Sequence, residues 1–156
     1  MHNQNWKWTA NIKITVRDLD DKILEVTEFH NLITTVGVNM MRDFLDGLAD
    51  GKVKYLGVGT DATPPVVGGT QLGTEVFRKA ITSNSKPGIG QYKTITYLAP
   101  ADAVVNIREL GWFCGAGALA SPNYNTGIMI SRVLYSRDKT NLESIQIERC
   151  DCITGV

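Results

Sequence analysis

The fold of this chain is decided by the stretch at residues 11–17, Asn-Ile-Lys-Ile-Thr-Val-Arg, in which apolar and polar side chains alternate. Successive side chains of a β-strand point to opposite faces, so this alternation predicts a strand with one buried face. A turn-forming stretch, Asp-Leu-Asp-Asp-Lys, follows at residues 18–22, and apolar residues return over residues 23–29. Together these segments predict a β-hairpin.

The rest of the chain is largely a series of short β-branched stretches separated by loops rich in glycine and proline. Pro64-Pro65 and Gly68-Gly69 cannot continue a ladder of backbone hydrogen bonds, so a loop is expected there. Further strands are expected at residues 53–58, 75–82, 92–98, 104–113, 126–136 and 142–153. We therefore expect a mainly β protein, an antiparallel, jelly-roll-like β-sandwich with roughly eight strands.

One segment has the periodicity of a helix instead. Between residues 34 and 50, four apolar residues recur at spacings of three and four: Met41, Phe44, Leu45 and Leu48. Thr34 or Thr35 can cap the start, and Gly51 stands just after the expected end. The segment is predicted to be the single amphipathic helix of the protein.

Composition and charge fit one globular domain that does not bind nucleic acid. The 156 residues are 43% apolar and 21% charged, which is ordinary for such a domain. Sixteen basic residues balance sixteen acidic ones, so the chain lacks the basic surplus that phosphate binding requires. Zero net charge also removes the self-repulsion that keeps a protein monomeric. We expect an N-terminal arm at residues 1–9 and a single sandwich domain at residues 10–156.

The sequence gives no sign of a membrane or export signal. No stretch approaches the ~18 consecutive apolar residues of a membrane span. The first residues, Met-His-Asn-Gln-Asn-Trp, lack the pattern of a signal peptide, so synthesis in the cytoplasm of a host cell is expected. The three cysteines, Cys114, Cys150 and Cys152, are an odd number and do not form a disulfide framework.

Motifs for catalysis or metal binding are weak. Only two histidines are present, His2 and His30, and no Gly-x-Ser-x-Gly elbow exists for a nucleophilic serine. The three cysteines lack the paired spacing and the fourth ligand of a structural zinc site. Cys150 and Cys152 share a face of their strand and are expected to be small buried apolar residues. We predict no catalytic residue, no cofactor and no metal site.

Several short motifs follow one another in a fixed order. They are Asn31-Leu32-Ile33-Thr34, Gly57-Val58-Gly59-Thr60, Pro64-Pro65, Leu72-x-x-Glu75-x-x-Arg78 and Ile107-Arg108-Glu109-Leu110-Gly111-Trp112-Phe113. This succession resembles a widespread group of small tailed-bacteriophage virion proteins of the tail, the baseplate or the capsid surface. Gly57, where alanine is common in that group, and the bulky Trp112 depart from the pattern.

The resemblance implies a non-enzymatic virion subunit, either a capsid decoration or cement protein or a tail or baseplate component. Its partners would be copies of itself, in a trimer or hexamer, and other virion proteins such as the major capsid or tail proteins. The alternative is a host-receptor or carbohydrate-binding module of the tail that uses loop aromatics such as Tyr124. An enzyme such as a cell-wall hydrolase is a third interpretation.

Two tryptophans near the N-terminus are candidate interface residues. Trp6 and Trp8 have the same parity, so both rings point the same way on an extended segment. Tryptophan buries a large area and is favoured at interfaces. The pair would either reach over a neighbouring subunit or pack on the core of its own domain.

Four charged residues lie among apolar neighbours on expected strands: Glu75, Arg78, Glu109 and Arg132. Charges are costly to bury unless they are paired. We hypothesise that Glu109 pairs with Arg78 or Arg132 and fixes the strand register. Solvent exposure of all four side chains is the alternative.

Overall fold

The computed structural model describes residues 5–155, with the side chain of Trp6 outside that description. Over these residues the elements are β1 (Trp6–Asp18), β2 (Ile23–His30), β3 (Leu32–Ile33), α1 (Thr35–Leu45), β4 (Val53–Gly59), β5 (Glu75–Ala80), β6 (Ser83–Ser85), β7 (Gln91–Leu98), β8 (Asn106–Cys114), β9 (Ile128–Asp138) and β10 (Glu143–Gly155). The described part of the chain contains no helix that is long and apolar enough to cross a bilayer.

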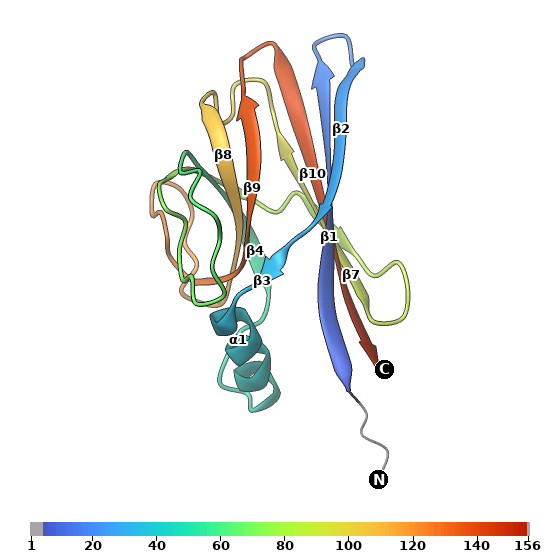
Figure 1. Ribbon diagram of the computed structural model, residues 1–156, viewed down its shortest axis with the longest axis vertical. Helices are drawn as coiled ribbons and strands as arrows, with labels where there is room; N and C mark the ends of the chain where they lie inside the picture. The colour runs from blue at the N-terminus through green and yellow to red at the C-terminus, as the bar shows by residue number, and fades with distance from the viewer. Residues whose placement is uncertain (1–4, 156) are drawn as a thin grey trace.

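The strands form two five-stranded antiparallel sheets (Figure 1). Sheet A has the order β2-β1-β10-β7-β6, and sheet B has the order β3-β9-β8-β4-β5. The expected antiparallel sandwich is therefore confirmed. The strand pairs β1–β2, β4–β5 and β8–β9 are neighbours both in the sequence and within one sheet.

The alternation at residues 11–17 places the core between the sheets. Ile12, Ile14 and Val16 are at most 1% exposed, while Asn11 and Lys13 face solvent. Full burial of each such apolar side chain contributes about 1.5–3 kcal/mol. The pairing of β1 with β10 begins at Trp6, opposite Gly155, so residues 6–9 of the expected arm belong to a strand of sheet A.

Helix α1 begins where the sequence predicted and ends earlier. The Thr34 hydroxyl accepts the Gly37 N–H at 3.1 Å, which caps the first turn. At the other end Gly47 has φ +72°, its N–H donates to the Phe44 carbonyl, and the Leu48 N–H donates to the Asp43 carbonyl. This pair of bonds is a Schellman motif. Gly47 rather than Gly51 therefore terminates the helix, because only a left-handed residue directly after the last turn can close these two bonds.

Replacing Gly47 by alanine should lower the free energy of unfolding by about 1–2 kcal/mol, since a Cβ is strained at this positive φ. Urea denaturation would measure the change. Gly68→Ala is the matched control, because Gly68 lies in a loop without positive φ and its added Cβ would have no atom within 4 Å. Equal stabilities of the two variants would contradict the Schellman assignment.

Candidate functional site

The structure pairs Glu109 of β8 with Arg132 of β9. Arg132 Nε donates to Glu109 Oε2 at 2.6 Å, and the Glu109 side chain is completely buried. The same carboxylate accepts the backbone N–H groups of Asp61, Gly73 and Thr74 at 3.3, 3.0 and 2.8 Å. Glu109 therefore holds both ends of the loop at residues 60–74 against sheet B.

A second buried pair holds the loop at residues 115–127. Arg78 Nε donates to Glu75 Oε1 at 2.6 Å, and both side chains are fully buried. The Arg78 guanidinium also donates to the Leu119 and Thr126 carbonyls of that loop, and its centre lies 4.1 Å from the centroid of the Phe113 ring. These contacts replace the water that the charge loses on burial.

The two loops lie side by side over the outer face of sheet B (Figure 1). Beneath them a small apolar cluster contains Leu72, Phe113, Ala118 and Met129. Of the two partners proposed for Glu109, the structure gives it Arg132, while Arg78 binds Glu75. None of the four charged side chains faces solvent, so their role in this geometry is to fasten the loops.

A third buried pair was not anticipated from the sequence. Arg149 is 0% exposed, donates to both carboxylate oxygens of Asp151 at 2.8 and 2.6 Å, and lies 5.1 Å from the Trp112 ring centroid. The sequence did contain a pattern that could have predicted this pair, because Arg149 and Asp151 fall on the same face of the strand as the core residues Ile145 and Ile147. A charge at that parity on a strand belongs to the inner face.

This third pair positions one of the candidate interface tryptophans. The Trp8 indole N–H donates to Asp151 at 2.8 Å, and the ring packs against the sandwich core. Trp8 is thus attached to its own domain, while the side chain of Trp6 lies outside the described residues. Tyr124, the third candidate interface residue, is 36% exposed on the loop at residues 115–127.

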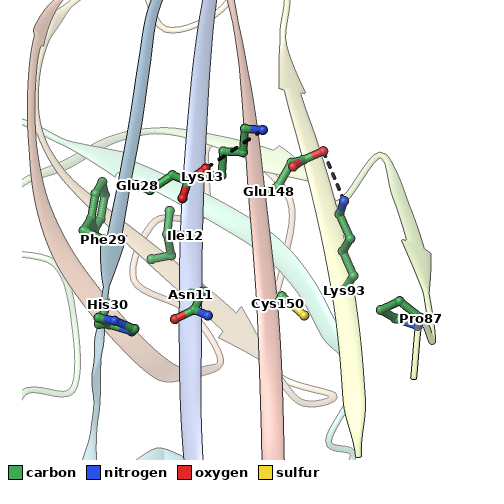
Figure 2. A pocket seen from close by; sticks show the side chains of 10 residues that line it. All are labelled: Asn11, Ile12, Lys13, Glu28, Phe29, His30, Pro87, Lys93, Glu148 and Cys150. Atoms are coloured by element: carbon green, nitrogen blue, oxygen red, sulfur yellow. Dashed lines mark ion pairs between the residues drawn. The ribbon is translucent and has the colours of Figure 1, made fainter. Parts of the chain in front are cut away.

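The outer face of sheet A has a depression of about 570 Å³ that is lined by both charged and apolar side chains (Figure 2). Two ion pairs lie across it, Lys13 with Glu28 at 4.0 Å and Lys93 with Glu148 at 3.2 Å. Its charges are therefore already paired with one another. Cys150 lines this depression and is half-buried, whereas the sequence predicted a buried residue. Partial burial, with the Asp151 charge as a smaller cause, raises the pKa of its thiol, which keeps the thiol protonated at neutral pH.

The described residues contain no cluster suited to a metal ion, in the sense of three or more His, Cys, Asp or Glu side chains gathered together. His30, a lining residue of the depression, lies opposite Asn11 in the sheet ladder. Cys114 is buried between the sheets, and burial raises the pKa of its thiol to about 12. The thiolate, which is the nucleophilic form of cysteine, is therefore disfavoured at both Cys114 and Cys150.

The end of the sandwich that carries α1 exposes apolar side chains instead. The helix packs on β9 through its buried residues Gly37 and Met40. The absence of a side chain at Gly37 allows the helix to approach β9 closely, because a Cβ there would lie only 2.9 Å from the Ile130 backbone. The apolar residues away from this contact are left exposed: Val38 by 55%, Phe44 by 53%, Leu45 by 73% and Leu48 by 76%. We call Val38, Met41, Leu45 and Leu48 the α1 stripe; Leu48 lies just beyond the last turn of the helix.

A groove of about 430 Å³ runs beside the α1 stripe. Its lining residues are Trp8, Ile33, Val38, Met41, Arg42 and Leu45. Apolar side chains dominate this lining, and two further hollows adjoin it at the same end, both lined by Met40 and Met41. Methionine adapts its shape to irregular partners, which suits a binding surface.

The opposite end of the sandwich is closed by charged groups. Arg137 binds Glu143 at 2.5 Å and Glu25 at 2.8 Å, which joins β9 to β10 and β2. The buried ammonium of Lys139 donates to three backbone carbonyls, those of Ala99, Pro100 and Thr140. The charged groups at this end satisfy one another within the chain, although Leu19 and Leu142 in its two turns are each 62% exposed.

Comparison with known proteins adds no family to this description. No protein-family model, no curated protein and no solved structure matches the chain. The function is therefore inferred from the surfaces of the molecule and from its sequence motifs.

Replacing Glu109 by glutamine should lower the free energy of unfolding by about 3–5 kcal/mol, because Arg132 loses its closest buried counter-charge and an amide group faces N–H donors. Chemical denaturation at neutral pH would measure the loss. The control is Asp138→Asn, which removes the exposed partner of Arg108 and should cost less than about 1 kcal/mol. A similar small loss in both variants would show that the buried pair does not stabilise the fold.

The hydrogen bond from Arg137 lowers the pKa of Glu143 below the usual carboxyl range, an effect partly opposed by burial. A carboxyl whose folded-state pKa is lowered contributes its full stability above its unfolded pKa of about 4.3 and loses it as the pH falls through the folded-state value. The stability difference between the wild type and Glu143→Gln should therefore be larger at pH 6 than at pH 3. Denaturation curves across this range would test it, and a constant difference would contradict it.

Proposed function

We propose that this chain is a non-enzymatic structural subunit of a tailed-bacteriophage particle, and that it works by assembling with copies of itself and with other virion proteins. The observation that carries the proposal is the exposed apolar end of the sandwich at α1. The order of motifs in the sequence, which resembles small virion proteins, supports the same conclusion.

The physical argument begins with the unburied side chains. An apolar side chain the size of leucine forgoes about 1.5–3 kcal/mol when it stays in water. Val38, Leu45 and Leu48 form a regular stripe in the sequence, yet the folded chain leaves each of them more than half exposed. Contiguous apolar surface of this kind marks a site where another protein or a membrane binds.

The rigidity of the sandwich suits a structural role. Its two long loops are fastened to sheet B by the buried carboxylates of Glu109 and Glu75, so the outer face of that sheet is a fixed surface. A subunit that acts by adhesion needs a stable shape and a contact area of about 800 Å² on each partner. A capsid decoration or cement protein is the form we favour, since these 156 residues contain no coiled-coil or repetitive stretch of the kind that forms a long fibre.

The alternative, a host-receptor or carbohydrate-binding module, is favoured by one feature, the depression on the outer face of sheet A. Its charged side chains pair with each other, and one aromatic residue, Phe29, is among its lining residues. Binding of the isolated protein to a glycan array would favour this second function over the first.

The proposal is tested on particles of the phage that carries this gene. We expect quantitative mass spectrometry to find the chain in purified particles at a fixed ratio to the major capsid protein. Leu48→Lys, supplied in trans to a phage lacking the gene, should enter particles at least about tenfold less, the effect of ~1.4 kcal/mol of lost binding. The matched control, Asn39→Lys, adds the same charge to an exposed position outside the stripe and should enter particles normally. Absence of the wild-type chain from particles would refute the proposal.

A further inference from the structure

We propose that the open edge of β1, next to the groove at α1, binds an extended segment of a partner protein as an added antiparallel strand of sheet A, and that apolar and acidic residues alternate in this segment. The inference rests on the proposed function in that it names the kind of chain that the apolar end receives. Four observations support it: the edge of β1, the position of the groove, the fixed ring of Trp8 and the charge of Lys7.

Strand β1 extends beyond its neighbour β2 at the α1 end of the sandwich (Figure 1). The pairing with β2 ends at Asn11, opposite His30. One further backbone bond on that side runs from the Asn31 N–H to the Ala10 carbonyl at 3.2 Å. From Trp6 to Thr9, β1 pairs with β10, and no described strand pairs with its other edge there. Four residues of edge backbone are therefore open to a further strand.

The direction of the open backbone groups follows from the pairing. The Ala10 carbonyl points to the β2 side, and every second residue of an antiparallel strand presents its N–H and C=O to the same edge. The backbone groups of Trp8, and of Trp6 before it, therefore point away from β10. Another extended chain can bond to them in series, whereas a helix uses its own N–H and C=O groups internally.

The groove of about 430 Å³ lies beside the same part of β1. Trp8 is among its lining residues, together with Ile33 of β3 and with Val38 and Leu45 of α1. Trp8 faces the interior of the sandwich, so the side chains of an added strand that share its face would enter this groove. An edge with a recess for alternate side chains is suited to peptide binding by strand addition.

The wall of the groove on the β1 side is fixed in the free chain. The Trp8 indole N–H donates to Asp151 at 2.8 Å, and Arg149 donates to both oxygens of that carboxylate. A wall that is already ordered loses little conformational entropy on binding. The groove therefore favours a segment that places apolar side chains next to the Trp8 ring.

The outer face of the same edge selects the charge of the segment. Lys7 is exposed, and its neighbour on β10 is the neutral Thr154. The residue opposite Lys7 in an added antiparallel strand would belong to a non-hydrogen-bonded pair, in which the side chains lie closest. Opposite charges stabilise such a pair and like charges destabilise it. An acidic residue is therefore expected there, between apolar residues that face the groove.

The first experiment measures the binding of a synthetic peptide to the purified full-length chain by NMR. The probe is the acetylated and amidated peptide Thr-Val-Glu-Val-Glu-Val-Thr. We expect saturable binding, with the largest shifts of backbone amides at Lys7, at Trp8 and in α1. The control peptide Thr-Val-Val-Glu-Glu-Val-Thr has the same composition without the alternation and should bind at least about tenfold more weakly, the effect of ~1.4 kcal/mol.

Methylated peptides test strand addition itself. In the added strand the valine N–H groups would point to β1 and the glutamate N–H groups to solvent. Methylation of the central valine nitrogen should weaken binding at least about tenfold, because it removes a hydrogen bond to β1 and adds a clash. Methylation of a glutamate nitrogen should have little effect. Equal losses in the two methylated peptides would contradict strand addition.

Variants of the chain locate the site. Lys7→Glu should weaken binding about fivefold and should prefer the charge-reversed peptide Thr-Val-Lys-Val-Lys-Val-Thr. Lys22→Glu makes the same change of charge in the exposed turn between β1 and β2 and should bind like the wild type. Val38→Asp should weaken binding at least about tenfold because it places a charge in the groove, while an acid near the helix N-terminus leaves the fold intact. Asn39→Asp is its matched control at an exposed position outside the groove lining.

The outcomes separate this inference from the proposed function. A wild-type chain that did not bind the alternating peptide, or bound both peptides equally, would overturn the inference. If Leu48→Lys still failed to enter particles in that case, the apolar end would contact a virion protein in another way and the proposed function would stand. Amide shifts at Lys7 and Trp8 that depend on protein concentration without peptide would also overturn it, because a second copy would then occupy the edge. Binding that is lost in Val38→Asp and kept in Asn39→Asp would support the inference, whatever the particle experiment gave.

Discussion

A charged group buried in this protein must find its counter-charge and its hydrogen-bond donors within the chain, and the outer layer of sheet B depends on that constraint. Glu109 satisfies it with Arg132 and three backbone N–H groups, all of which lie on β9 or on the loop at residues 60–74. Burial of an isolated carboxylate would cost several kcal/mol. The loop can therefore leave sheet B only by removing three backbone N–H donors from the Glu109 carboxylate.

The two ends of the sandwich differ in how their side chains are accommodated within the chain. At the end opposite α1, Arg137, Glu143 and Lys139 complete their contacts within the chain. At the α1 end the polar group of Trp8 is satisfied by Asp151, but the helix beside it keeps its apolar stripe in solvent. The charged groups at the end opposite α1 are thus satisfied within the single chain, while the α1 end has an apolar groove suited to contact with another protein.

This asymmetry connects the fold to the proposed role in a virion. A subunit of a particle needs a rigid body and at least one surface whose burial stabilises the assembly more than the free chain. Here the fastened loops and the buried pairs provide the rigid body, and α1 with its groove provides the surface. The depression on the outer face of sheet A is also concave, but its charged side chains pair with one another.

The class of fold, the long strands, the start of the helix and the need to pair buried charges were predictable from the sequence. These follow from local rules: period-two alternation in β1, the capping threonine Thr34, and the cost of placing Glu109 or Arg132 among apolar neighbours. The short strands β3 and β6 were not predicted, because two or three residues become a strand only through the partners that pair with them. Which arginine binds which glutamate was likewise open, since strand order and register set those distances. Tertiary structure alone decided that α1 would pack through Gly37 and Met40 and leave its stripe outside, because that depends on how closely β9 lets the helix approach.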